Sequence, residues 1–219
     1  NRVTPKAAIN YKVKPGLSIY ANLGGGVEVP AGNEVDPANS NGDDKTHLVS
    51  TLLNKPITST TMEVGAKHVI FLDNPGFLKS FQYDVAVYSI SSQNDLIPYQ
   101  SGAFYLQAAS TSRKGIEASF IAQLPEGISV MASATFASNT YNNYTLDSLF
   151  TKSSFDSNLV GKTASYADNK LPGVPNMFAT VRLRYVPTFF TYMFLEAEMR
   201  NVGEYFADDA NKVTVAFYN

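Results

Sequence analysis

The stretch that decides the fold is residues 112–140, SRKGIEASFIAQLPEGISVMASATFASNT. Its middle, Pro125-Glu126-Gly127, has the residue types of a tight turn. Apolar residues recur at every second position, as Ile116, Ala118, Phe120, Ala122 and Leu124 before the turn and as Ile128, Val130, Ala132, Ala134 and Phe136 after it. Because successive side chains of a strand point to opposite faces, this pattern predicts a β-hairpin with one apolar face.

The length of the two strands indicates where the hairpin lies. Strands of soluble proteins usually have about five or six residues, whereas about 9–11 residues are needed to cross a bilayer at a tilt. The alternating runs on both sides of the turn reach the second length. We therefore interpret the stretch as a transmembrane β-hairpin, with a soluble β-sandwich as the alternative that shares its alternation.

The rest of the chain repeats this unit. The pattern predicts strands at residues 4–13, 17–24, 58–71, 78–92, 104–124, 128–139, 177–185 and 191–202, and a ninth from about residue 212. Short and long connections alternate along the chain, and the long ones are polar. Outer-membrane barrels have tight turns at one end and long loops at the other. The sequence thus predicts an all-β, antiparallel, up-and-down transmembrane barrel.

Composition excludes several classes of function. The chain has 219 residues with a net charge of −2, so it has no basic surface for nucleic acid. It has no Cys, which excludes disulfides and thiolate chemistry. No run approaches the 18 or so apolar residues of a membrane-spanning helix. A barrel is compatible with that, because it hides its apolar content in alternate residues.

Four segments, taken in order, resemble signatures of one family. The first two are LNKPITSTTMEVGAK (residues 53–67) and VAVYSISSQNDLIPY (residues 85–99). The third is AASTSRKGIEASF (residues 108–120), and the last pairs LPGVPNMFA (residues 171–179) with NVGEYFADDANKV (residues 201–213). Together they resemble the C-terminal part of the β-barrel domain of a TonB-dependent outer-membrane receptor. The chain departs from the family pattern at Ile57 and Met177, where an acidic residue and a His are frequent.

The resemblance implies a barrel of about 22 strands closed around a plug. Residues 1–219 would then be a partial barrel domain, without the plug domain and the final strands. It also implies a bacterial outer-membrane receptor that takes up a scarce ligand, most often a ferric siderophore or similar chelate, when a periplasmic TonB-type complex acts on the plug. The implied partners are lipid, plug, the remaining strands, that complex and the ligand. Neither an enzymatic activity nor a cofactor is implied.

Charged residues on one parity of the predicted strands are candidates for the barrel interior. Glu196 and Glu198 lie on one face of their strand, and Arg182 and Arg184 lie on the strand before it. We expect these four, together with Glu117 and Arg200, to face the lumen or the plug and to pair across strands. A carboxylate pair for acid–base catalysis is the alternative reading of the two glutamates.

Aromatic residues in and beside the long connections are candidates for ligand binding. Six side chains are expected at the mouth of the barrel: Tyr99, Tyr105, Arg113, Tyr141, Tyr144 and Tyr166. The tyrosines would grip a ligand by stacking, and ordinary packing of the loops is the alternative.

Other functions have weaker support. A passive porin would lack the plug, and an outer-membrane hydrolase would need a catalytic His, yet neither His47 nor His68 lies in a motif. The run NSNGDD at residues 39–44 has oxygen ligands but not the spacing of a calcium loop. We therefore expect no catalytic residue and no metal site in this chain.

Overall fold

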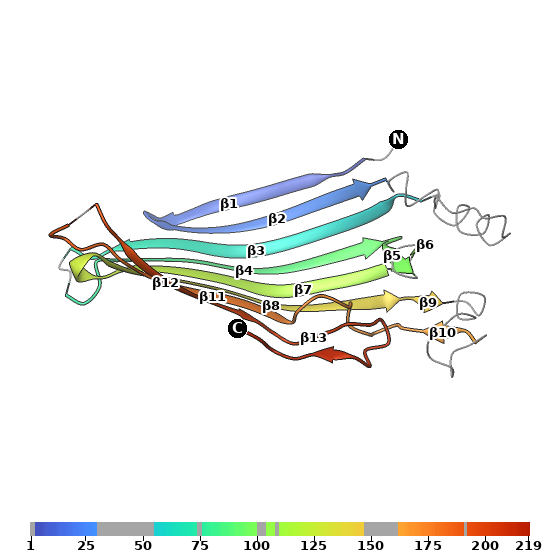
Figure 1. Ribbon diagram of the computed structural model, residues 1–219. Helices are drawn as coiled ribbons and strands as arrows, with labels where there is room; N and C mark the ends of the chain where they lie inside the picture. Colours follow the sequence, from blue (N-terminus) through green and yellow to red (C-terminus); the bar gives the residue numbers. More distant parts are fainter. Residues whose placement is uncertain are drawn as a thin grey trace.

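The computed structural model describes residues 3–29, 55–73, 76–99, 104–107, 110–146, 162–190 and 192–219 (Figure 1). Eight long strands form one antiparallel sheet in which neighbours along the chain are neighbours in space, in the order β1-β2-β3-β4-β7-β8-β11-β12. They are β1 (Lys6–Lys14), β2 (Leu17–Glu28), β3 (Ile57–Phe71), β4 (Ser80–Gln93), β7 (Ser110–Gln123), β8 (Ile128–Asn143), β11 (Met177–Tyr185) and β12 (Leu195–Val202). The predicted antiparallel, up-and-down architecture is confirmed, as an open sheet rather than a closed barrel.

Three pairs of short strands complete the described structure. They are β5 (Leu96–Tyr99) with β6 (Phe104–Gln107), β9 (Thr145–Leu146) with β10 (Ala164–Ser165), and β13 (Tyr205–Phe206) with β14 (Thr214–Val215). The pairs β5–β6 and β9–β10 lie at the end of the sheet where the long connections begin, and the turns β1–β2, β3–β4, β7–β8 and β11–β12 lie at the other end (Figure 1). The two are called here the loop end and the turn end.

The register fixes two faces of the sheet. Val64, Val87 and Ile116 lie opposite one another on β3, β4 and β7, and Ile116 lies opposite Phe136 on β8. The apolar face, so named here, contains Ile9, Ile19, Ala21, Leu23, Met62, Val64, Val85, Val87, Ile116, Phe120, Val130, Ala132, Phe136, Val181, Leu183, Leu195 and Met199. The polar face contains Asn10, Tyr20, Asn22, Glu63, Lys67, Asp84, Tyr88, Glu117, Ser119, Ser133, Thr180, Arg182, Arg184, Glu196, Glu198 and Arg200.

The apolar face has no second layer packed on it in the described part of the chain. Val64 is 61 % exposed, and Val87 and Phe136 are each 55 % exposed. A continuous apolar surface of this kind is unstable in water, because burial of apolar area is the main favourable term in folding. It is the surface that a bilayer covers in a membrane barrel. The soluble β-sandwich alternative needs this face buried inside one core, and the structure shows it exposed.

The β7–β8 turn has the predicted residues, and both Glu126 and Gly127 have a positive φ. Pro125–Gly127 form a single 3-10 turn, and Gly127 has a φ of 77°. A Cβ at this position would lie 1.9 Å from the carbonyl oxygen of Val186 in the β11–β12 turn. Glycine is therefore required by both conformation and space.

In the described residues no helix has the length and hydropathy that a bilayer crossing requires.

Several strand predictions were wrong in part. The strands expected at residues 17–24 and 128–139 continue to Glu28 and Asn143. The single strand expected at residues 104–124 is divided into β6, which pairs with β5, and β7, which belongs to the main sheet. The strand expected from residue 191 begins at Leu195, because the preceding residues belong to the turn. The ninth strand meets the sheet only at a bridge between Val202 and Tyr218, while Thr214–Val215 pair with β13.

Candidate functional site

The polar face near the turn end contains a ladder of charges. Arg182 lies opposite Glu198, and Arg184 lies opposite Glu196. The Arg182 Nε donates to Glu198 Oε2 at 2.7 Å, and Arg200 also binds the Glu198 carboxylate. The Arg182 Nε is 3.5 Å from Glu196 Oε1. The guanidinium of Arg184 lies over the ring of Phe194, 4.3 Å from its centroid.

This ladder gives the two glutamates arginine partners. A general acid needs a carboxyl group that holds a proton at working pH, and an adjacent guanidinium favours the ionised form instead. The geometry thus favours the charge-pairing alternative over acid–base catalysis. Exposed pairs of this kind contribute about 0–1 kcal/mol each, so the ladder is a source of surface charge more than of stability. Its contact with a plug stays a prediction.

A second charged group lies on the polar face of β2, β3 and β4. Lys67 pairs with Asp84 at 2.8 Å, and its ammonium is 5.2 Å from the centroid of the Tyr20 ring. The Tyr20 hydroxyl is hydrogen-bonded to Glu63. Glu63 and Lys67 belong to the first family-like segment, so those signature residues join one network on the polar face. Glu117, also predicted for the interior, lies on this face opposite Ala86 and Thr135.

Two tyrosines of the polar face cover glycines on the next strand. Tyr20 lies opposite Gly65, and Tyr88 lies opposite Gly115. A Cβ at residue 65 would be 2.5 Å from the Tyr20 ring, and one at residue 115 would be 2.6 Å from the Tyr88 hydroxyl. The missing side chain thus makes room for an aromatic ring that covers the exposed backbone. Both glycines lie in family-like segments, Gly65 in residues 53–67 and Gly115 in residues 108–120. The sequence did not predict that tyrosines would cover them.

At the loop end the predicted ligand residue Arg113 is already paired. Its Nη2 donates to Asp95 Oδ2 at 3.1 Å, and Thr111 Oγ1 donates to the same oxygen at 2.9 Å. The other oxygen of Asp95 accepts from the backbone N of Leu96 at 3.1 Å. Asp95 therefore ties the start of the β5–β6 pair to β7.

Three of the predicted ligand tyrosines form a cluster. The ring centroids of Tyr141 and Tyr144 are 4.9 Å apart, and those of Tyr144 and Tyr166 are 5.2 Å apart. Tyr141 is 2 % exposed and Tyr144 is 3 % exposed, and Ile97 and Leu171 pack against them. Stacking on a ligand would require this cluster to open, so the geometry favours loop packing. A ligand-binding role for these residues stays a prediction.

The remaining two predicted tyrosines, Tyr99 and Tyr105, lie in the short pair at the loop end. Tyr99 is the last residue of β5, and Tyr105, on β6, lies opposite Pro98 of β5. The β5–β6 pair lies at the same end of the sheet as β9 and β10 (Figure 1). His47 and residues 39–44 lie outside the described residues. In the part of the chain that is described, no three His, Asp or Glu side chains gather as a metal site.

The sequence missed a contact made by the segment around residue 210. The hydroxyl of Tyr141 donates to Asp209 Oδ1 at 2.7 Å. The side-chain amide of Asn211 pairs with the backbone of Lys170 in both directions, accepting from its N at 2.7 Å and donating to its O at 2.9 Å. We call this the Asp209–Asn211 clasp. Burial raises the pKa of the Asp209 carboxyl, as does the charge of Asp208, whereas the Tyr141 hydrogen bond opposes them.

Solved structures with this architecture are receptors and transporters. The siderophore receptor PiuA from Acinetobacter baumannii matches with a TM-score of 0.64 and 20 % identity, over 97 % of this chain and 28 % of that chain. The ferric-catecholate import receptor Fiu from E. coli K12 matches with 0.63 and 20 %, over 97 % and 27 %. The copper transporter OprC matches with 0.64 and 16 %, over 97 % and 29 %.

These likenesses show the fold, and the chain spans under a third of each structure. No curated protein matches the sequence. The family match covers residues 1–219 and is described as "TonB dependent receptor-like, beta-barrel". The sequence resemblance is therefore confirmed, and the chain belongs to the TonB-dependent receptor β-barrel family.

Proposed function

We propose that this chain is part of the wall of a plugged outer-membrane barrel of about 22 strands, which takes up a ferric siderophore or similar chelate by energy-coupled transport. The observation that carries the proposal is the division of eight strands into one exposed apolar face and one charged polar face. The apolar face contacts lipid. The polar face contacts the plug and the ligand path.

The choice of ligand class rests on the fold neighbours. PiuA and Fiu are named as a siderophore receptor and a ferric-catecholate receptor. OprC, with the same fold, is named as a copper transporter, so fold alone does not select iron. The described arginines of the polar face do not select a cargo either, because Arg113 is paired with Asp95 and both Arg182 and Arg200 are paired with Glu198. The proposal of a ferric chelate therefore rests on the names of PiuA and Fiu.

The test is growth of a strain that depends on the full receptor gene. Under iron limitation, with single ferric siderophores supplied, deletion of the gene should abolish growth on at least one of them, and plasmid-borne receptor should restore it. Loss of TonB should have the same effect as loss of the receptor. Growth that survives loss of TonB would indicate a passive channel, and a defect confined to copper limitation would assign a copper cargo.

A further inference from the structure

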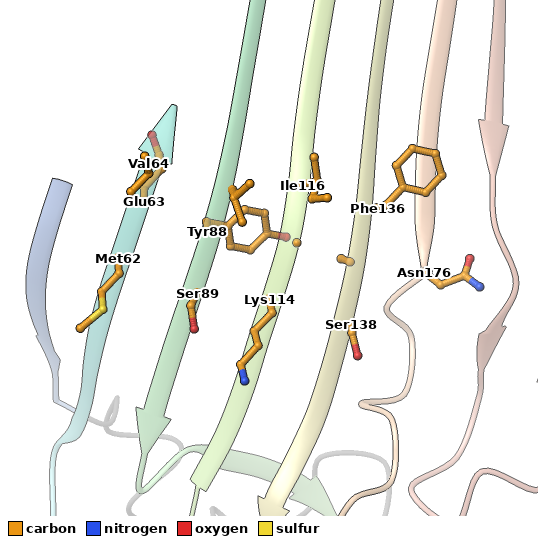
Figure 2. Close-up of a pocket in the computed structure, with 13 residues that line it drawn as sticks. Met62, Glu63, Val64, Tyr88, Ser89, Lys114, Ile116, Phe136, Ser138 and Asn176 are labelled. Carbon is orange, nitrogen blue, oxygen red and sulfur yellow. The ribbon is translucent and has the colours of Figure 1, made fainter. Parts of the chain in front are cut away.

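The two faces of the sheet are covered differently near the loop end. On the apolar face, Val64, Ile116 and Phe136 line an open groove (Figure 2). The other side of the same strands carries a small core. The residues that are at most 7 % exposed there are Ser92, Ile97, Thr111, Asn139, Tyr141 and Tyr144.

The layer that buries this core comes partly from β5, outside the main sheet. Ser92, Thr111 and Tyr141 lie opposite one another on β4, β7 and β8. They share the parity of Glu117 and therefore lie on the polar face. Ile97 of β5 packs in one buried cluster with Tyr141. The strand β5 thus lies against the polar face at the loop end.

Two polar anchors fasten this layer to the sheet. The first is Asp95, which accepts hydrogen bonds from Thr111 at 2.9 Å and from Arg113 at 3.1 Å. The second is the Asp209–Asn211 clasp, in which Tyr141 donates to Asp209 at 2.7 Å. The anchors belong to segments that are far apart in the sequence and meet at one place in the fold.

Tyr141 connects the two anchors. Its hydroxyl belongs to the clasp, and its ring packs in the cluster that contains Ile97, two residues after Asp95. Tyr141 also interacts electrostatically with Asp95 itself. The ring is 2 % exposed, and close-packed interiors transmit a displacement to their neighbours. Tyr141 therefore cannot shift with one anchor and leave the other undisturbed.

We propose that β5 and residues 205–213 open as one unit, because Tyr141 couples their anchors. Local opening of proteins occurs in cooperative units whose members share buried contacts. Loosening the clasp then loosens β5, and loosening Asp95 loosens the clasp, since coupling between two sites is reciprocal. Access to the polar face at the loop end then requires both segments to open together. That consequence rests on the proposed function, whereas the coupling itself does not.

The variant Asn211→Gly tests the coupling in the full receptor, purified in detergent. Glycine removes the side-chain amide of the clasp and accepts the φ of 55° at this position. Amide exchange, followed by mass spectrometry, should accelerate at Val213, whose N donates to Asp208 beside the clasp. It should also accelerate about fivefold or more at Leu96, whose N donates to Asp95. In the reciprocal variant, Asp95→Ala, exchange at Val213 should accelerate by a similar factor.

The matched control is Asp168→Gly. Asp168 also has a positive φ, of 66°, and its side chain is exposed in a turn next to the tyrosine cluster. This variant should leave exchange at Leu96 unchanged. Val69, whose N donates to Gly16 at the turn end, reports on the sheet as a whole. Equal acceleration at Leu96 and Val69 in Asn211→Gly would indicate global destabilisation and would overturn the coupling.

The variant Ile97→Ala tests the path of the coupling, because it removes the packing of β5 on the tyrosine cluster and leaves the Asp95 carboxylate in place. In this background, Asn211→Gly should no longer accelerate exchange at Leu96. An unchanged rate at Leu96 in Asn211→Gly alone would overturn the proposal, as would the same acceleration with and without Ile97. A receptor that shows the coupling but fails the growth test would overturn the proposed function only.

Discussion

The ring of Tyr20 lies against Gly65 on the neighbouring strand, so closely that a Cβ at residue 65 would be 2.5 Å from the ring. Gly65→Ala should therefore destabilise the folded barrel by about 1–3 kcal/mol, because the tyrosine must leave its place. The measurement is the urea midpoint of unfolding, followed by the shift of the heat-modifiable band on gels.

Gly24 provides the control for this variant. It is likewise a strand glycine, on β2, but a Cβ there would meet nothing within 4 Å. Gly24→Ala should leave the midpoint nearly unchanged. If the two variants lost equal stability, the effect would come from the loss of a strand glycine and not from the Tyr20 contact.

The two faces of β8 should respond differently to a charge. Val130 lies on the apolar face, and Ser133 lies on the polar face. Val130→Arg should cost about 2–4 kcal/mol if the residue is near the middle of the bilayer, while Ser133→Arg should cost much less. Refolding into lipid vesicles at increasing denaturant measures both, and equal costs would contradict the assignment of the faces.

Asp95 should control the local stability of the loop end. Its carboxylate accepts from Thr111, Arg113 and the backbone of Leu96. Asp95→Ala leaves these donors unpaired, including Thr111, which is 1 % exposed. The variant should lower the free energy of local unfolding at the loop end by about 1–3 kcal/mol, and amide exchange at Leu96 should therefore accelerate. Asp73→Ala, at the turn end, should leave exchange at the loop end unchanged.

The clasp should weaken as pH rises. Burial raises the pKa of Asp209, so the folded state favours the neutral carboxyl. Its contribution is therefore most favourable below the pKa of the unfolded chain and is lost as pH rises through the raised pKa. Amide exchange at Lys170, corrected for intrinsic rates, should show less protection at neutral than at acidic pH. Asp209→Asn should remove this dependence, and an unchanged profile in that variant would assign the titration to another group.

Alternation was sufficient to predict the long strands, because each lies in one sheet with one exposed apolar face. The strand Met177–Tyr185 has the predicted bounds. Alternation could not show that the stretch from residue 104 changes partners, since β6 and β7 share the same pattern while pairing with different strands. Which strand a segment pairs with depends on contacts distant in sequence, which the local pattern does not contain.

The loop-end residues were harder to predict for a related reason. Residue type and position identified Tyr141 as a loop aromatic, but its hydrogen-bond partner, Asp209, is 68 residues away. Burial of the ring depends on that partner and on Ile97 and Leu171. The charge ladder was easier, because Arg182 and Glu198 lie on consecutive strands joined by one turn.

Because the register fixes two different faces, changes of length should be tolerated differently in the strands and in the connections between them. Adding or removing one residue within a long strand would exchange the faces of the following residues of that strand. Charged side chains would then lie on the apolar face, and apolar side chains on the polar face. Within the strands, substitution therefore preserves the two faces, whereas an inserted residue preserves them only where a bulge absorbs it, as at the register shift between Lys12 and Lys14. Connections carry no such parity, and segments there can lengthen or shorten while the wall beneath them stays in frame.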